Sequence, residues 1–109
     1  MSDRIQRYDA FWPYYLGEHR RPRTRALHYF GSLGGVAIAL AAIATGHWWL
    51  LVPALVAGYL FAWIGHAFVE RNRPATFTYP LWSFVSDFRM LWFWLTGRLD
   101  GEMERHGIR

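Results

Sequence analysis

Residues 26–69 read "ALHYFGSLGGVAIALAAIATGHWWLLVPALVAGYLFAWIGHAFV", and they decide the fold. None of these 44 residues is Asp, Glu, Lys or Arg, whereas both flanking segments are crowded with charge. A soluble domain of 109 residues would distribute its apolar residues through the chain in short periodic segments. Because the apolar residues are pooled instead, the sequence predicts a single integral membrane domain over residues 1–109.

The uncharged segment is long enough for two membrane passes. A bilayer core about 30 Å thick takes roughly 20 helical residues to cross. Gly46 and His47 interrupt the apolar run near its middle. We therefore expect an all-α protein built on a helical hairpin, with transmembrane helices over residues 26–45 and 48–69.

The flanking segments predict further helices. Aromatic residues recur at helical spacing in residues 5–16, which predicts an amphipathic helix lying on the membrane. Residues 79–96 are also aromatic-rich, but Asp87 and Arg89 stand at their centre, where a charge costs about 2.5–3.5 kcal/mol on insertion scales. We expect an interfacial or re-entrant helix there, with a third crossing as the alternative, and a polar tail over residues 98–109.

Arginines flank the hairpin at its open end. Four precede it and two follow it: Arg20, Arg21, Arg23, Arg25, Arg71 and Arg73. Such clusters face the cytoplasm, so we expect a bacterial inner membrane with both hairpin ends on the cytoplasmic side. The basic pI comes from these juxtamembrane residues without any nucleic-acid motif, so the expected partner is the lipid bilayer and not nucleic acid. The abundant tryptophan and Gly34 leave a homodimer open.

Small residues form a stripe on each predicted membrane helix. Such stripes let helices approach closely in lipid. Folding the chain at Gly46-His47 would pair the two stripes in three places: Gly31 with Ala62, Gly35 with Gly58, and Ala39 with Ala54.

Two histidines end these stripes at the same depth. His28 and His66 are each 19 residues from His47, so the hairpin should bring them together near the cytoplasmic face. Glu70 follows one helical turn after His66, and His19 lies nine residues before His28. Titratable groups near a membrane interior indicate function. His47 and His106 are expected to have no such role.

Together these side chains predict a metal site. The chain has no cysteine, and three imidazoles with one carboxylate form a ligand set for Fe(II), with Zn(II) or Mn(II) left open. Two or three histidines plus a carboxylate, with open positions, suit iron that uses dioxygen as co-substrate. A neighbouring acceptor should fix each ring's tautomer, and Glu18 or Asn72 could serve.

Other functions would use the same residues differently. Two histidines at equal depth can ligate a haem in an electron carrier, although close helix packing leaves little room for a macrocycle. A non-enzymatic membrane scaffold or lipid-binding protein would leave the histidines without a role. A membrane desaturase needs many more histidines in clustered boxes, and this chain has five.

Two segments resemble a known family. "YYLGEHRRPRTRALHYFGS", residues 14–32, and "GHAFVERNRPA", residues 65–75, resemble the small membrane-protein family whose fungal member is an iron-dependent 2-hydroxy fatty acid dioxygenase. The resemblance covers roughly residues 8–97. Longer members have a second hydrophobic hairpin where this chain has only the segment around Asp87 and Arg89.

The resemblance implies an activity and residues that carry it. The activity is shortening of a 2-hydroxy fatty acid by one carbon with dioxygen, and the implied catalytic ligands of Fe(II) are His19, His28 and His66. Glu70 lies in the matching second block and is the candidate fourth ligand. Candidates for binding the substrate, whose carboxylate suits a bidentate arginine, are Arg25, Asn72 and Arg73.

Overall fold

The structure, a computed structural model, describes residues 4–74 and 77–108. Residues 1–3, 75–76 and 109, which the expected single domain and its polar tail include, lie outside the described residues. Within those ranges the chain is helical and contains no strand, which confirms the all-α expectation. The elements are α1 (Tyr8–Gly17), α2 (Pro22–Thr45), the 3₁₀-helix η1 (Trp48–Leu50), α3 (Leu51–Ile64), the π-helix η2 (Gly65–Glu70), α4 (Pro80–Leu95) and α5 (Leu99–Arg105).

The chain divides into two compact units. The hairpin unit comprises residues 21–72 and therefore contains α2, η1, α3 and η2. The aromatic unit comprises residues 1–20 and 73–109 and contains α1, α4 and α5.

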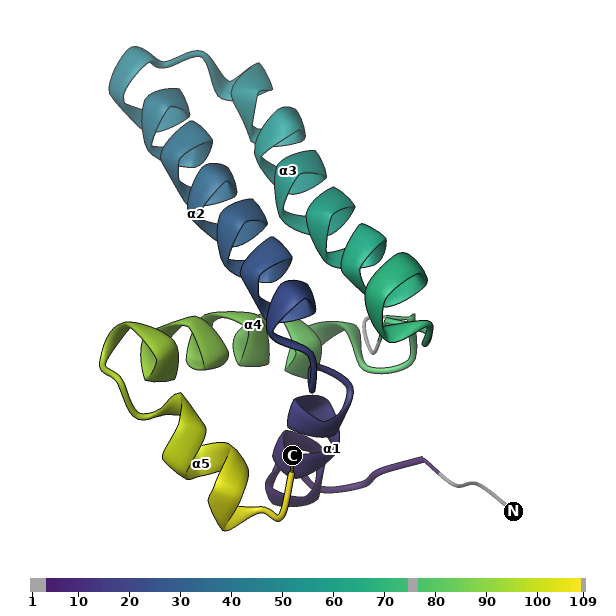
Figure 1. The fold of residues 1–109 in the computed structure, drawn as a ribbon. Helices are drawn as coiled ribbons and strands as arrows, with labels where there is room; N and C mark the ends of the chain where they lie inside the picture. The colour runs from purple at the N-terminus through teal and green to yellow at the C-terminus, as the bar shows by residue number, and fades with distance from the viewer. Residues whose placement is uncertain (1–3, 75–76, 109) are drawn as a thin grey trace. The chain divides into compact units, whose positions relative to one another are not determined.

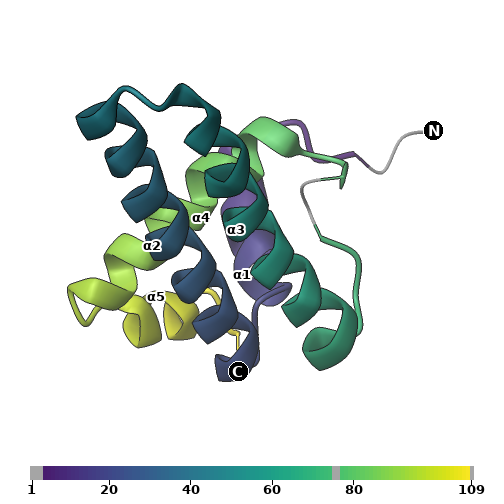
Figure 2. The same cartoon turned by 90° about the horizontal axis from the view of Figure 1, so that it is seen from above.

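In the hairpin unit, α2 and α3 run side by side and are joined at one end by a short connection (Figures 1 and 2). The 24-residue α2 begins at Pro22, which occupies a position where a helix needs no amide hydrogen, and ends at Gly46 in the left-handed region with φ 74°. By length and composition, two continuous helical segments could cross a membrane: Pro22–Thr45 and Trp48–Glu70.

The two helices pack through their small residues, close to the expected pairing. A Cβ added at Gly35 would lie 3.7 Å from the backbone nitrogen of Gly58, its expected partner, but only 2.8 Å from the carbonyl oxygen of Ala54. One at Gly31 would lie 2.7 Å from the carbonyl oxygen of Ala57, so the tightest contacts come from residues earlier on α3 than expected.

The connection between the helices accounts for a small part of this difference. Trp48–Leu50 form a 3₁₀-helix before α3 begins. A 3₁₀-helix rises about 2.0 Å per residue and an α-helix 1.5 Å, so these residues advance the returning chain by about 1.5 Å, roughly one α-helical residue.

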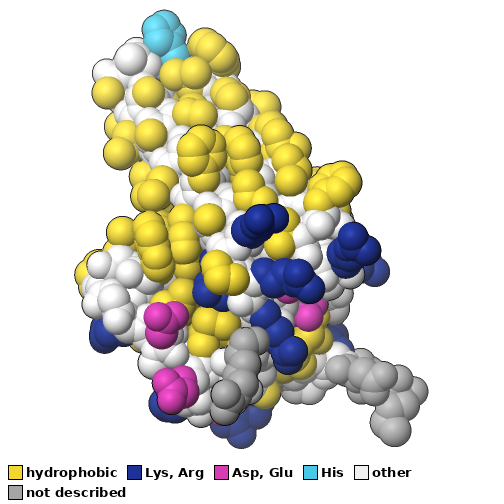
Figure 3. Space-filling model, in the orientation of Figure 1, with side chains coloured by type: hydrophobic (Ala, Val, Ile, Leu, Met, Phe, Trp, Pro, Cys, Tyr) yellow, Lys and Arg dark blue, Asp and Glu magenta, His cyan; other side chains and the backbone are white. Residues whose placement is uncertain are grey.

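Large hydrophobic side chains of the hairpin unit point outward. Figure 3 shows them covering the visible face of the upper part of the molecule, where Figure 1 draws α2 and α3. Leu40, Ile43 and Val52 are each about 60% exposed, whereas the buried hydrophobic residues on these helices include Ala42, Ala54 and Ala62. This distribution suits an apolar surrounding rather than water.

The aromatic unit differs in that it buries large side chains of α1, while α4 exposes large hydrophobic residues such as Leu81, Trp92 and Leu95. Phe11, Trp12, Tyr15 and Leu16 of α1 are at most 2% exposed. The Phe11 ring lies against Tyr79 and Trp82, at centroid distances of 5.1 and 5.5 Å. We expected this face of an amphipathic helix over residues 5–16 to lie on the membrane. Instead protein covers it, and α1 begins at Tyr8.

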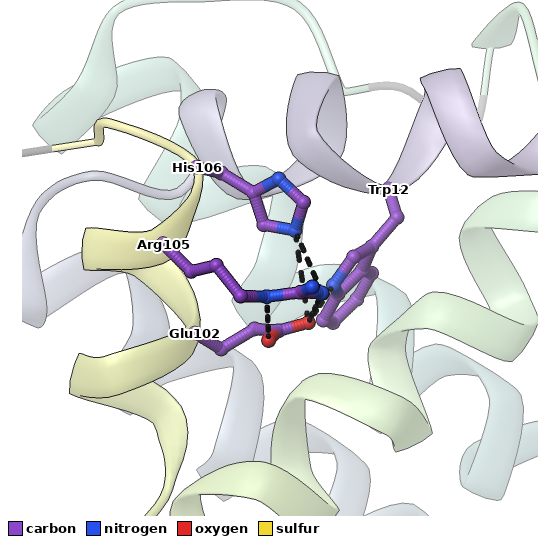
Figure 4. Close-up of polar contacts among 4 residues, drawn as sticks. All are labelled: Trp12, Glu102, Arg105 and His106. Atoms are coloured by element: carbon purple, nitrogen blue, oxygen red, sulfur yellow. Dashed lines mark hydrogen bonds and ion pairs between the residues drawn. The ribbon is translucent and has the colours of Figure 1, made fainter.

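A polar cluster joins α5 to α1 within the aromatic unit (Figure 4). The Trp12 indole Nε1–H donates a hydrogen bond to Glu102 Oε2 at 2.7 Å, and Arg105 Nε donates to Glu102 Oε1 at 3.2 Å. His106 Nε2 lies 3.7 Å from the same carboxylate. The beginning of the expected polar tail is thus a short helix anchored to a buried tryptophan.

The segment expected to be an interfacial, re-entrant or third membrane helix forms α4. With 16 residues, α4 is shorter than the roughly 20 residues that a crossing requires. Its buried side includes Ser83, Ser86 and Met90. The central Asp87 accepts a hydrogen bond from the hydroxyl of Tyr15 at 2.5 Å, so α1 supplies a partner for the charge that the sequence places mid-helix.

Candidate metal centre

His28 on α2 and His66 on η2 meet inside the hairpin unit, as the sequence predicts. Their Nε2 atoms lie 3.4 Å apart, and the ring centroids are 5.5 Å apart with the planes at 86°. Both side chains are buried, with His28 4% and His66 2% exposed. The two rings therefore direct the same nitrogen, Nε2, toward one point.

The separation of 3.4 Å suits a shared cation better than a hydrogen bond. An N–H···N hydrogen bond is typically about 3.0 Å long. Two nitrogens that bind one metal at about 2.1 Å with a near-tetrahedral angle lie about 3.4 Å apart. The chemistry and spacing of this donor pair thus fit a metal ion.

The chain directly after His66 fixes the orientation of its ring. The Nδ1–H of His66 donates a hydrogen bond to Asn72 Oδ1 at 2.6 Å, which leaves the lone pair on Nε2. The amide of Asn72 also donates to the carbonyl of His66 at 2.9 Å. Asn72, for which substrate binding was predicted, therefore has the orienting role that we assigned to either Glu18 or Asn72.

The turn that brings Asn72 back to His66 has two unusual backbone features. Gly65–Glu70 form a π-helix, a form frequent at functional sites. Arg71 then adopts the left-handed conformation with φ 61°, which residues other than glycine seldom occupy. Strain of this kind persists where surrounding contacts hold it, and here the contacts of Asn72 do so.

His19 lies in the turn after α1, in the aromatic unit. Its Nδ1–H donates to the carbonyl of Tyr15 at 2.7 Å, and its ring stacks on the Tyr15 ring at 4.1 Å. This arrangement again leaves the lone pair on Nε2. His19, His28 and His66 are all buried, and each could offer one ring nitrogen to a metal ion.

Glu70 has a different partner from the one we expected. Its Oε2 accepts a hydrogen bond from the backbone amide of Arg21 at 2.6 Å, at the residue that caps α2. The candidate ligand group among residues 4–74 and 77–108 consists of histidines only. A carboxylate near the start of a helix also stabilises its dipole, so Glu70 helps to hold the open end of the hairpin together.

The two arginines predicted to bind substrate belong to different units. Arg25 is partly buried on α2 in the hairpin unit. Arg73 begins the second segment of the aromatic unit, and its guanidinium lies 5.1 Å from the centre of the Phe77 ring. These positions leave substrate binding by either arginine a prediction.

Tyr15 and Asp87 support His19 and were not among the predicted site residues. The Tyr15 ring stacks on His19, while its hydroxyl donates to Asp87. Burial raises the pKa of Asp87 to about 7, although the hydrogen bond from Tyr15 opposes this rise. The signals in the sequence were a carboxylate within an apolar helix and a tyrosine four residues before a histidine.

Comparison with known proteins agrees with these features. A family model described as "2-hydroxy-palmitic acid dioxygenase Mpo1-like" matches residues 5–99. No curated protein and no solved structure matches the chain. The matched region contains all three buried histidines and most of the described elements. The chain belongs to the 2-hydroxy-palmitic acid dioxygenase Mpo1-like family.

Proposed function

We propose that this protein is a membrane-embedded, non-haem Fe(II) dioxygenase that shortens 2-hydroxy fatty acids by one carbon. Membership of the family supports the substrate class and the use of dioxygen. The observation that carries the proposal is the His28–His66 pair, whose Nε2 atoms lie 3.4 Å apart while Asn72 holds Nδ1 of His66.

We assign His28, His66 and His19 as the metal ligands. His19 is the proposed third ligand because it is buried, its Nδ1 is engaged by the Tyr15 carbonyl, and it lies two residues before the hairpin unit begins. Fe(II) held by these nitrogens would supply the redox chemistry by which dioxygen reacts with the 2-hydroxy acid. We do not assign Glu70 as a ligand, since its carboxylate caps α2.

The remaining groups of the chain orient these ligands and exclude water. The Tyr15 carbonyl and the Asn72 side chain each accept the Nδ1 proton of a ligand histidine, so in the neutral ring the lone pair that can bind a metal is on Nε2. Burial of the three imidazoles keeps bulk water from their nitrogens. Arg25 and Arg73 remain the candidates for holding the substrate carboxylate.

The hairpin supports a location of this chemistry beside lipid. Its outward hydrophobic side chains are suited to acyl chains, and its open end carries the histidines and arginines. A fatty acid could therefore keep its tail in the bilayer while its head reaches the metal. We propose a location in the bacterial inner membrane, with the centre at the cytoplasmic face.

The same geometry disfavours a haem between His28 and His66. Axial nitrogens on opposite sides of one iron lie about 4 Å apart, twice a metal–nitrogen bond of about 2.0 Å, with the macrocycle between them. The two Nε2 atoms are only 3.4 Å apart. The close approach of Gly31 to Ala57 on the same two helices also leaves no space for a macrocycle.

Metal content and turnover test the proposal together. Anaerobically purified protein should bind about one iron per chain and convert a 2-hydroxy fatty acid and dioxygen into a product one carbon shorter, detected by mass spectrometry. His28→Ala and His66→Ala should lose both properties. His47→Ala is the matched control, since His47 is exposed and lies at the opposite end of the hairpin.

Two outcomes would contradict the proposal. Iron retained at wild-type levels in both histidine variants would show that His28 and His66 do not bind it. Iron bound by the wild type without any shortening of 2-hydroxy fatty acids would favour the non-enzymatic lipid-binding alternative.

A further inference from the structure

A second feature of the hairpin unit is an open pocket of about 570 Å³ at its charged end. The beginning of α2 and the end of η2 form this pocket. It is lined by Arg21, Pro22, Arg23, Phe68, Val69 and Arg71. The histidine pair does not line it, and none of its arginines was predicted to bind substrate.

The pocket has an excess of positive charge. No carboxylate among the described residues forms an ion pair with the guanidinium of Arg21, Arg23 or Arg71. Glu70 directly precedes Arg71, and its Oε2 accepts a hydrogen bond from the backbone amide of Arg21 at 2.6 Å rather than from a guanidinium. The pocket is therefore lined by three arginines and by no acidic residue.

The remaining wall of the pocket is apolar. Phe68 is 75% exposed, and Pro22 and Val69 lie beside it. The pocket is thus amphiphilic, lined by both cationic and apolar residues. It also lies where the two segments long and apolar enough to cross a membrane end, at Pro22 and Glu70.

The backbone holds one of the cations in place. Arg71 occupies the left-handed region with φ 61°, at a position where glycine would be the ordinary choice. The adjoining contacts of Asn72 with His66 keep this turn closed. An arginine in such a turn keeps a guanidinium at the pocket despite the conformational cost.

We infer that this pocket binds the phosphate head of an acidic phospholipid. Arginine forks match phosphate oxygens, and basic clusters next to membrane spans attract anionic lipids. The apolar wall suits the beginning of the acyl chains. The inference rests on the membrane location proposed above but not on the metal or the reaction.

Native mass spectrometry of the detergent-purified protein tests this site. The probes are phosphatidylglycerol, which is anionic, and phosphatidylcholine, which is zwitterionic with the same acyl chains. The wild type should retain one phosphatidylglycerol per chain in preference to phosphatidylcholine. Arg21→Gln and Arg23→Gln should each weaken retention about fivefold, the expected effect of one juxtamembrane arginine.

Arg71→Gly separates loss of binding from loss of fold. Glycine adopts a φ of 61° without strain, so this variant should keep the turn and its metal content while binding phosphatidylglycerol about fivefold more weakly. Arg71→Lys should restore part of the binding. Arg7→Gln is the matched control, because Arg7 is exposed, pairs with Asp9 and lies outside the pocket.

Three results would overturn the inference. They are equal retention of the two phospholipids, wild-type retention in all three arginine variants, and displacement of phosphatidylglycerol by one equivalent of palmitate. The last result would assign the pocket to a fatty-acid carboxylate. Iron content and turnover, measured on the same preparations, report separately on the proposed enzyme.

Discussion

The hairpin unit and the aromatic unit bury side chains of different size. In the hairpin unit the buried hydrophobic residues include Ala42, Ala54 and Ala62, and large side chains face outward. In the aromatic unit the buried residues include Phe11, Trp12 and Met90. Water drives large apolar groups inside, whereas lipid leaves close contact between small residues as the main source of packing. The two units therefore differ in the size of the side chains that form their interiors, and substitutions should affect them differently.

The largest expected effect is loss of the aromatic core. Phe11→Ala should lower the free energy of unfolding by about 3–5 kcal/mol, since the ring is fully buried among Tyr15, Tyr79 and Trp82. Chemical denaturation followed by near-ultraviolet circular dichroism measures it. Phe84→Ala is the control, because Phe84 is 44% exposed on α4 and should change stability little. Equal losses of unfolding free energy in both variants would contradict a core centred on Phe11.

The next effect should come from adding a methyl group to the hairpin. Gly35→Ala puts a Cβ 2.8 Å from the Ala54 carbonyl oxygen, and backbone cannot move aside easily, so we expect a cost of about 1–3 kcal/mol. Gly34→Ala on the same helix meets nothing within 4 Å and should be tolerated. Thermal unfolding in detergent compares them, and similar melting temperatures would argue against close helix packing.

A third substitution should weaken metal binding and leave the packing of both units unchanged. Asn72→Ala removes the acceptor of the His66 Nδ1–H, and loss of such a partner typically lowers metal affinity about 10–100-fold. Competition with a chelator measures the affinity, and Asn72→Asp, which keeps an acceptor oxygen, should recover most of it. An unchanged metal affinity in Asn72→Ala would show that Asn72 does not orient His66 for metal binding.

The change that should be smallest from one measurement to the next is a gradual pH dependence confined to the aromatic unit. The pKa of Asp87 is raised by burial from 3.8 to about 7. A carboxyl with a raised folded-state pKa favours folding below its unfolded pKa, and this contribution is lost as pH rises through the folded pKa. The free energy of unfolding should therefore be unaffected by Asp87 below about pH 3.8. It should then decline between pH 3.8 and about pH 7, by no more than about 1.4 kcal/mol per pH unit. Denaturation at several pH values measures the slope, which Asp87→Asn should flatten. A slope unchanged in that variant would assign it elsewhere.

Much of the hairpin could be predicted from the sequence because its pattern is local. The uncharged run, its break at Gly46 and the equal spacing of His28 and His66 from His47 lead to two helices whose histidines meet. The tightest contacts of the glycines could not be predicted, because they depend on how the backbones of the two helices approach each other, which no residue type specifies.

The rest of the chain depends on contacts between distant segments. The aromatic face of α1 has the pattern of a helix on a membrane, and only the packing of Tyr79 and Trp82 against Phe11 distinguishes the two cases. In the same way, Glu70 has ligand-like spacing from His66, but the capping of α2 at Arg21 decides where its carboxylate lies. The arginines that line the pocket also could not be told from their neighbours by sequence.

The π-helix at Gly65–Glu70 has a consequence for how this centre could be lost. A π-turn is an α-helix with one residue added, so deleting Ala67 would let the segment relax to ordinary helical pitch. The contacts between His66 and Asn72 span this turn, so its hydrogen-bond pattern sets where Asn72 lies relative to His66. In the shortened segment His66 and Asn72 would no longer be held in this arrangement. Every histidine and arginine would still be present, so an inventory of residues would report an intact centre in a chain that had lost it.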